Sequence, residues 1–246
     1  MLPKDAKTEE LRAQALAAIR SEKRVGPHFK PTLLEIDADG TATIEAEVDN
    51  VAIKRLALER LAATQGVGAI VDRLRVKPAM AMSDDGILDH LRKAFYDDPS
   101  FRQLALKERE GGQLKLVRDA FEDARGEIEF EVKKGVVILN GRVPGLASKR
   151  LAGVLAWWVP GSRDVINGIA VEPPEEDAPI QIEEAVRIAL DKDPFVDASQ
   201  IRVGVRHRTV RLTGSVHSSE ARDAAEWDAW YVFGVDDVIN EIEVVP

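Results

Sequence analysis

The feature that most constrains the fold of this chain is a segment that occurs three times without a gap. Gly40 to Val76, Gly135 to Val171 and Arg208 to Val244 align with no insertion. Valines and a glycine recur at the same places in all three copies. They are Val48, Val143 and Val216; Gly66, Gly161 and Gly234; and Val76, Val171 and Val244. Repetition at this length predicts one small folding unit used three times.

Each copy predicts the order helix, strand, strand, helix, strand. Apolar residues at helical spacing place the first helices at Thr8–Glu22, Asp85–Tyr96 and Ile182–Asp191. They place the second helices at Val51–Thr64, Leu146–Val159 and Ser218–Val232, and we expect Gly66, Gly161 and Gly234 to end them. Between the two helices, alternation of apolar and polar residues predicts a β-hairpin.

The hairpin turns differ between the copies. Asp39-Gly40 and Lys134-Gly135 suit a two-residue turn in which φ is positive. His207-Arg208 occupies the same place in the third copy without a glycine. We expect that turn to be either strained or longer.

The predicted fold class is α+β, with three tandem α-β-β-α-β sandwich domains at 1–78, 84–172 and 180–246. Each domain is expected to have a three-stranded mixed sheet covered on one face by two helices. The second domain alone contains an inserted segment, at about 102–125. Its apolar residues fall on one helical face, which predicts a further helix there: Leu114, Val117, Ala120, Phe121 and Ala124.

Several short motifs resemble the BON (bacterial OsmY and nodulation) domain family. They are GRV at Gly141, GSV at Gly214, GSRDVIN at Gly161 and GVDDVIN at Gly234. The first copy departs most, with Ala46 in place of the motif glycine and Asp72 in place of the asparagine. The resemblance implies a non-catalytic bacterial binding module linked to the cell envelope, to osmotic and other stress responses and to phospholipid. Sensing of a small cation is a further alternative with precedent in the family.

Two second helices carry aromatic residues that point away from the core of their own domain. Alanines one turn apart, such as Ala152 and Ala156, mark the face that packs on the sheet. On the other faces lie Val154, Trp157 and Trp158 in the second copy and Trp227, Trp230 and Tyr231 in the third. An apolar patch outside the core predicts an interface.

Three interpretations of this patch remain open. The helices could pack on each other, on the inserted segment or across a homo-oligomer, because buried aromatic side chains stabilise such contacts. The aromatics could instead insert at a phospholipid surface, where tryptophan and tyrosine are favoured. A groove for a peptide or small ligand is the third.

Charges are distributed unevenly over the outward sheet faces. Acidic residues alternate along the first and second copies, and basic residues along the third. The acidic sets are Glu35, Asp37, Glu45 and Glu47, and Glu127, Glu129 and Glu131; the basic set is Arg202, Arg206 and Arg211, with Arg208 at the hairpin tip. The basic set predicts contact with an anionic headgroup or an acidic neighbouring face. The alternative is that the charged faces are solvated sheet surface or pair with the acidic linker residues Glu175, Glu176 and Asp177.

Composition excludes several classes of protein. A net charge of −9 disfavours a general nucleic-acid binder, which needs a basic surface. The absence of cysteine excludes disulfides and thiol chemistry. The longest apolar run, Leu151–Pro160, is shorter than the ~20 residues of a membrane-spanning helix, so we expect a soluble chain with peripheral membrane contact at most.

No catalytic or metal-binding motif is recognisable. His28 and His90 stand apart from other metal ligands, and His207 and His217 flank a single strand. No phosphate-binding loop or nucleophile elbow occurs. We therefore expect no enzyme activity, no metal and no cofactor. The polar N-terminus lacks the apolar stretch of a signal peptide, which predicts a cytoplasmic protein, or a periplasmic one if the natural chain begins earlier.

Overall fold

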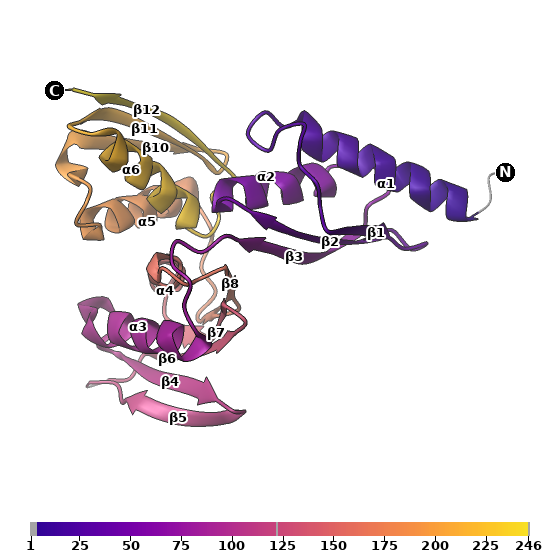
Figure 1. Ribbon diagram of the computed structural model, residues 1–246. Helices are drawn as coiled ribbons and strands as arrows, with labels where there is room; N and C mark the ends of the chain where they lie inside the picture. The colour runs from indigo at the N-terminus through magenta and orange to yellow at the C-terminus, as the bar shows by residue number, and fades with distance from the viewer. Residues whose placement is uncertain (1–3, 122, 246) are drawn as a thin grey trace. The chain divides into compact units, whose positions relative to one another are not determined.

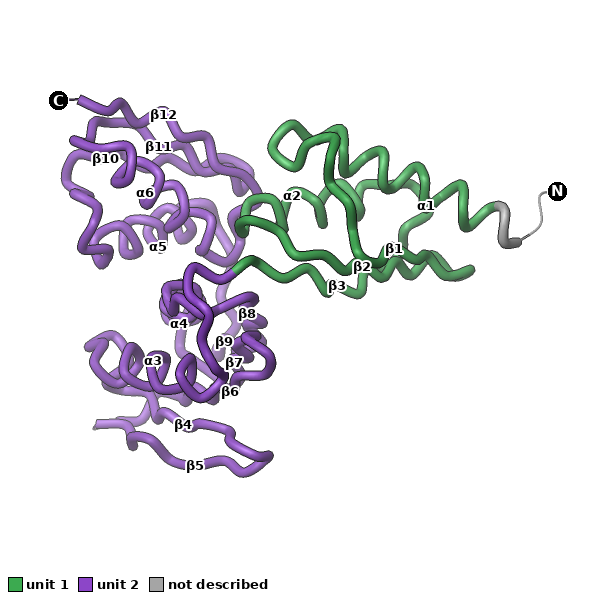
Figure 2. Tube along the Cα trace, in the orientation of Figure 1, with its two compact units in different colours: residues 1–77 green, residues 78–246 purple. Residues whose placement is uncertain are grey.

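The computed structural model describes residues 4–121 and 123–245. The chain divides into two compact units, residues 1–77 and residues 78–246 (Figure 2). The first unit contains the first copy of the repeat, and the second unit contains the other two. Within the described ranges, no helix is both long and apolar enough to span a bilayer.

The first unit is a three-stranded mixed sheet with two helices. Its elements are α1 (Lys4–Ser21), β1 (Leu33–Ile36), β2 (Thr41–Val48), α2 (Val51–Ala62) and β3 (Ala69–Val76). The sheet order is β1-β2-β3, with β1 antiparallel and β3 parallel to β2. Ile19 and Leu61 of the helices and Ile44 and Leu74 of the sheet are fully buried together in one core.

The third copy has the same topology (Figure 1). Its elements are α5 (Pro179–Lys192), η2 (Ala198–Gln200), β10 (Ile201–Arg206), β11 (Thr209–Val216), α6 (Ser219–Tyr231) and β12 (Asp237–Val244). The order β10-β11-β12 again combines an antiparallel hairpin with a parallel third strand. The predicted α+β class is confirmed.

The second copy has a larger sheet than predicted. Its repeat elements are α3 (Asp84–Asp97), η1 (Pro99–Phe101), β6 (Gly126–Lys133), β7 (Val136–Val143), α4 (Leu146–Trp158), β8 (Asp164–Asn167) and β9 (Ala170–Val171). Two further strands, β4 (Leu104–Glu110) and β5 (Gln113–Arg118), give a six-stranded sheet in the order β5-β4-β6-β7-β8, with β9 also pairing with β7. The expectation of three strands was therefore wrong for this copy.

The inserted segment is a β-hairpin, so the predicted helix was wrong. Gly111 and Gly112 both have positive φ and form the turn. Leu104 and Leu106 alternate into the core of the sheet, which a helix could not do. The helical spacing of the apolar residues after Leu114 does not reflect the structure, because Leu114 and Leu116 are exposed on β5.

The turns also differ from the expectation. Lys134-Gly135 is the predicted two-residue turn with both φ values positive. His207 and Arg208 make the same turn with φ values of 47° and 64°, a region that disfavours side chains, so this turn is strained and not longer. In the first hairpin the last paired residues are Ile36 and Ala42, so its loop is longer than two residues. Within this loop only Gly40 has positive φ.

The second helices end before the glycines that were expected to cap them. Val159 and Val232, directly after α4 and α6, are extended. Gly161 is required by packing, since a Cβ there would lie 2.6 Å from Met82 Cβ and 2.8 Å from an Ile87 side-chain carbon. These glycines belong to the turn toward the last strand and not to the helix ends.

The three copies share hydrogen bonds at equivalent positions. In each copy, a carbonyl group of the hairpin turn accepts a hydrogen bond from the N–H group of the residue before the last strand. These bonds are Gly68 N to Gly40 O at 2.9 Å, Arg163 N to Gly135 O at 2.8 Å and Asp236 N to Arg208 O at 2.9 Å. The motif asparagine fastens the last strand to the second helix: Asn167 Nδ2 to Lys149 O at 2.8 Å and Asn240 Nδ2 to Arg222 O at 3.1 Å. In the first unit Asp72 replaces this asparagine and pairs with the Lys54 ammonium at 2.6 Å.

Candidate functional site

The predicted aromatic residues meet at a junction inside the second unit, where α4 contacts α5 and α6. The rings of Trp157 on α4 and Tyr231 on α6 are stacked, with centroids 5.7 Å apart and planes inclined by 12°. The indole Nε1 of Trp158 donates a hydrogen bond of 2.9 Å to Oδ1 of Asp228. The outward faces of the second and third copies therefore cover each other.

Burial differs among the predicted residues. Trp230 is 0% exposed and Val154 is 1% exposed, so neither presents a surface to lipid or to another protein. Of the three interpretations of this patch, the burial of these two residues agrees with packing of the helices on each other. Trp157, Trp158, Trp227 and Tyr231 are partly buried.

Charged contacts reinforce the junction. Arg150 on α4 is 1% exposed, donates from Nε to Phe233 O at 2.9 Å, and forms an ion pair with Asp177. Lys192, the last residue of α5, pairs with Asp98 at 2.9 Å. Sequence reasoning missed Arg150, although a charged residue in the otherwise apolar stretch Leu146–Trp158 was the available signal.

The carboxyl group of Asp228 is the most perturbed titratable group at the junction. Burial raises the pKa of Asp228 to about 8; the Trp158 hydrogen bond opposes this shift, and nearby Asp193 adds to it. Oδ1 accepts from Trp158, whereas Oδ2 has no hydrogen-bond partner among the described residues. Burial, and then the nearby Asp228, raise the pKa of Tyr231 to about 12. Asp228 is thus protonated at neutral pH.

The acidic linker does not pair with the arginines of β10. Glu175 Oε2 instead accepts from the Leu146 N–H at 2.6 Å, at the first turn of α4. Asp177 pairs with Arg150. The linker therefore stabilises the start of α4 and the junction, and the expected neutralisation of the basic sheet face by the linker was wrong for these two residues.

The predicted basic residues are exposed on the third sheet. They are Arg202, Arg206, Arg208 and Arg211. Arg211 pairs with Glu241 of β12, whose outward side also presents Asp237 and Glu243. The face is therefore basic along β10 and acidic along β12. The sequence of the β10–β11 hairpin alone does not show this, because β12 comes from a later part of the chain. Arg208 is also held at its turn, where Nε donates to Gly234 O at 2.7 Å.

The acidic stripe of β6 is neutralised by neighbouring cations. Glu127 pairs with Lys107 at 2.5 Å and Glu129 with Arg109 at 3.0 Å, so β4 of the inserted hairpin supplies both partners. Glu131 pairs with Lys133. In the first unit, Arg73 of β3 lies 3.8 Å from Glu45. Neither sheet is a purely acidic surface.

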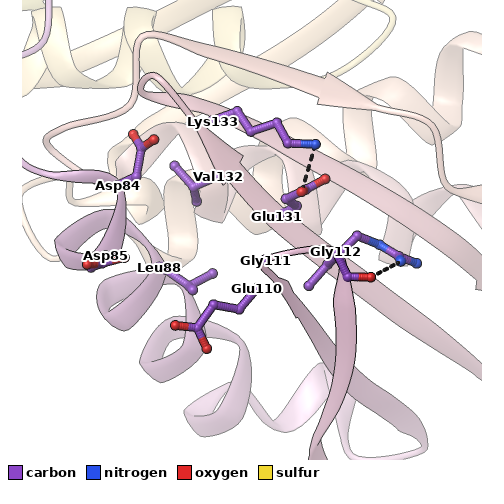
Figure 3. A pocket seen from close by; sticks show the side chains of 10 residues that line it. Asp84, Asp85, Leu88, Glu110, Gly111, Gly112, Glu131, Val132 and Lys133 are labelled. Atoms are coloured by element: carbon purple, nitrogen blue, oxygen red, sulfur yellow. Dashed lines mark hydrogen bonds and ion pairs between the residues drawn. The ribbon is translucent and has the colours of Figure 1, made fainter.

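Two cavities lie apart from the junction. One, of about 460 Å³, lies between α3, the turn of the inserted hairpin and the end of β6 (Figure 3). Leu88 and Val132 line it, together with charges that are already engaged: Lys133 with Glu131, Arg109 with Glu129, and Asp84 with the N–H groups of Lys134 and Gly135. The other, of about 600 Å³, is a groove between α1 and β1.

Neither cavity brings side chains together in a recognisable catalytic arrangement. Among the described residues, no group of three or more histidine, aspartate or glutamate side chains is arranged to hold a metal ion. The strongly shifted carboxyl, Asp228, is outside both cavities and is buried in the junction. A buried carboxyl group with a shifted pKa can belong to a structural contact between helices and need not bind a substrate.

Comparison with known proteins identifies the repeat. A family model described as the BON domain matches residues 115–173 and 181–246. A search of curated proteins gave no significant match. Among solved structures, the C-terminal domain of CdsD, the structural protein of the type III secretion system of Chlamydia trachomatis, is 13% identical, with 96% of this chain and 98% of that chain covered and a TM-score of 0.25. A second CdsD structure has the same identity and TM-score, with 96% and 93% covered.

Proposed function

The chain belongs to the BON domain family, and we propose that it is a non-catalytic binding and structural protein made of three BON repeats, at 1–78, 84–172 and 180–246. The observation that carries the proposal is the junction of α4, α5 and α6. There Trp157 stacks on Tyr231, and Trp158 bonds to Asp228. Aromatic stacking and a desolvated hydrogen bond favour a fixed pair of domains over two independent ones. The second and third repeats would then act as one binding body.

Shared hydrogen bonds support the proposal that the first unit is also a BON repeat. Its sheet order matches that of the third copy, and Gly68 bonds to Gly40 as Asp236 bonds to Arg208. The Lys54–Asp72 ion pair also links α2 to β3, the role that the asparagine amide has in the other copies. Because this ion pair keeps the link between helix and strand, it supports the proposal that the first unit diverged from the same repeat as the other two copies.

We expect that loss of the ring stack separates the two repeats. Trp157→Ala combined with Tyr231→Ala removes the stack, and we expect cleavage of the linker by a glutamate-specific protease, after Glu175 or Glu176, to accelerate roughly tenfold. The measurement is the rate of appearance of the two fragments on a gel. Leu116→Ala is the matched control, because Leu116 is 61% exposed on the inserted hairpin. Equal cleavage rates in all three proteins would contradict a fixed junction.

A second candidate function is association with an anionic surface, in keeping with the family's links to phospholipid and to the bacterial envelope. The exposed side chains of Arg202 and Arg206 on β10, next to the hairpin tip at Arg208, favour it. Clustered arginines attract anionic headgroups by about 1 kcal/mol for each charge near the surface. The partly buried aromatics are less suited to this contact than the sheet edge.

Liposome flotation tests the second candidate. With vesicles that contain phosphatidylglycerol at low salt, Arg202→Glu combined with Arg206→Glu should reduce bound protein about tenfold or more. Lys93→Glu with Arg125→Glu is the control, because it changes net charge equally at exposed positions on the second repeat. If the wild type does not float, or if the control loses as much binding, the arginines of β10 are not a lipid site.

A further inference from the structure

The second repeat contains a strand added to the edge of the repeat's sheet. In the first and third copies, the sheet begins at the edge strands β1 and β10. In the second copy the corresponding strand, β6, is covered by β4, which runs parallel to it and pairs Leu104–Glu108 with Gly126–Phe130. The fold of this repeat therefore accepts a parallel strand at that edge.

The register identifies the same edge in the first unit. Ile44 and Leu139 are equivalent in the gapless alignment, and they pair with Leu34 and Phe130 respectively. Leu34 is thus the counterpart of Phe130, and residues 30–34 are the counterparts of residues 126–130, to which β4 is bonded. The 600 Å³ groove is lined by Lys30, Pro31, Thr32, Leu33, Leu34 and Glu35. The groove lies where the second repeat has its own added strand.

The groove has hydrogen-bonding groups along one wall and side chains along the other. Asp37 N–H bonds to Thr41 O, so in the alternating antiparallel ladder the N–H and C=O groups of Leu34 and Ile36 point to the free edge. The opposite wall is a stripe of α1: Glu9, Arg12, Leu16 and Arg20. Leu16 supplies an apolar surface between two guanidinium groups.

Contacts of β4 indicate the chemistry of the missing strand. Leu104 and Leu106 of β4 are buried, and Glu108 at the next inward position pairs with Arg92 of α3 at 2.7 Å. Arg92 also contacts Asp89 one turn earlier, as Arg12 contacts Glu9. In the first unit, Arg12 contacts Glu9, and Arg20 donates from Nε to Phe29 O at 2.9 Å. Both line the groove, where their remaining guanidinium N–H groups can meet a carboxylate that enters it.

We propose that the groove between α1 and β1 binds an extended segment of a partner protein, which adds to β1 as a parallel strand. The segment carries apolar side chains at alternate positions, directed toward Leu16, and an acidic side chain that pairs with Arg12 or Arg20. Main-chain hydrogen bonds supply affinity in this mode, and the alternate side chains supply specificity. Pro31 donates no hydrogen bond, so the ladder lies along the residues that follow it.

A peptide with the sequence of β4 tests the proposal on the full chain. The probe is the fluorescently labelled segment Gln103–Glu110, QLALKERE, with blocked ends. Anisotropy should report saturable binding, weakened at least tenfold by Arg12→Glu. Lys23→Glu, an exposed change just after α1 and outside the groove, should leave binding unchanged. A peptide with proline in place of the second leucine should not bind, because proline interrupts the strand ladder.

Amide exchange locates the bound peptide. Slower exchange at Leu34 and Ile36, without change at Ile128 and Phe130, is the expected result. Absence of binding at millimolar peptide, equal binding to the Arg12→Glu variant, or protection beside β6 alone would overturn the proposal. A dimer in light scattering that Arg12→Glu dissociates, with no peptide bound, would assign the groove to a second copy and would overturn it as well.

Discussion

Replacing Trp230 with alanine is expected to lower the free energy of unfolding of the second unit by about 3–5 kcal/mol, because truncation of a buried tryptophan removes its burial and leaves a cavity. Trp230 is the largest of the fully buried side chains. The four tryptophans of the chain all lie in residues 78–246, so their fluorescence during urea denaturation reports this unit. The midpoint of unfolding should move to a clearly lower urea concentration, whereas the slope of the unfolding free energy against urea concentration should not change.

Trp227→Ala is the matched control for this prediction. Trp227 is on the same helix but is only partly buried, so we expect it to lose less than half as much stability. If the two variants were equally stable, or if Trp230→Ala mainly reduced binding to vesicles with an unchanged midpoint, Trp230 would be a contact residue and not part of the core.

Asp228→Asn is expected to stabilise the second unit, and increasingly so as pH rises. The folded pKa of Asp228 is about 8, against roughly 3.9 for an unfolded aspartate. Since folded Asp228 holds its proton more tightly, its contribution to stability is full below pH 4, declines as pH rises and is lost through pH 8. Asparagine stays neutral and still accepts from Trp158. At 1.36 kcal/mol per pKa unit, the gain at pH 7 is about 4 kcal/mol.

The measurement is urea denaturation of wild type and variant from pH 4.5 to 8.5. The difference in unfolding free energy should be small at the acid end and largest near pH 8. Asp223→Asn, an exposed change on the same helix, should show no such trend. A constant difference across this range would mean that Asp228 is ionised in the folded protein.

Local patterns in the sequence were sufficient to predict the repeated fold. The gapless alignment gave the order of elements, and alternation gave the hairpins, because both depend on neighbouring residues. The inserted segment was misjudged for the same reason. The spacing of apolar residues after Leu114 predicts a helix, whereas Gly111-Gly112 permits the tight turn of a hairpin, and the structure has the hairpin.

The candidate site was only half predictable. Helix geometry predicts that Trp157 and Tyr231 point away from the cores of their own repeats, and in the structure their rings stack on each other. Their mutual stacking depends on how the linker orients one repeat on the other, and no local pattern contains that information. Asp228 and Arg150 carried a weak signal as charged residues on helices that must pack, whereas their partners come from distant parts of the chain.

The ion pairs of Lys107 and Arg109 with the glutamates of β6 make the charge of that strand depend on the inserted hairpin. Without the inserted hairpin, Glu127 and Glu129 would lose their counter-charges and repel each other along a bare strand. A related protein that lacks the insertion should therefore carry neutral or basic residues at these two positions. The inserted hairpin and the acidic side chains of β6 should then be retained or lost together in related chains.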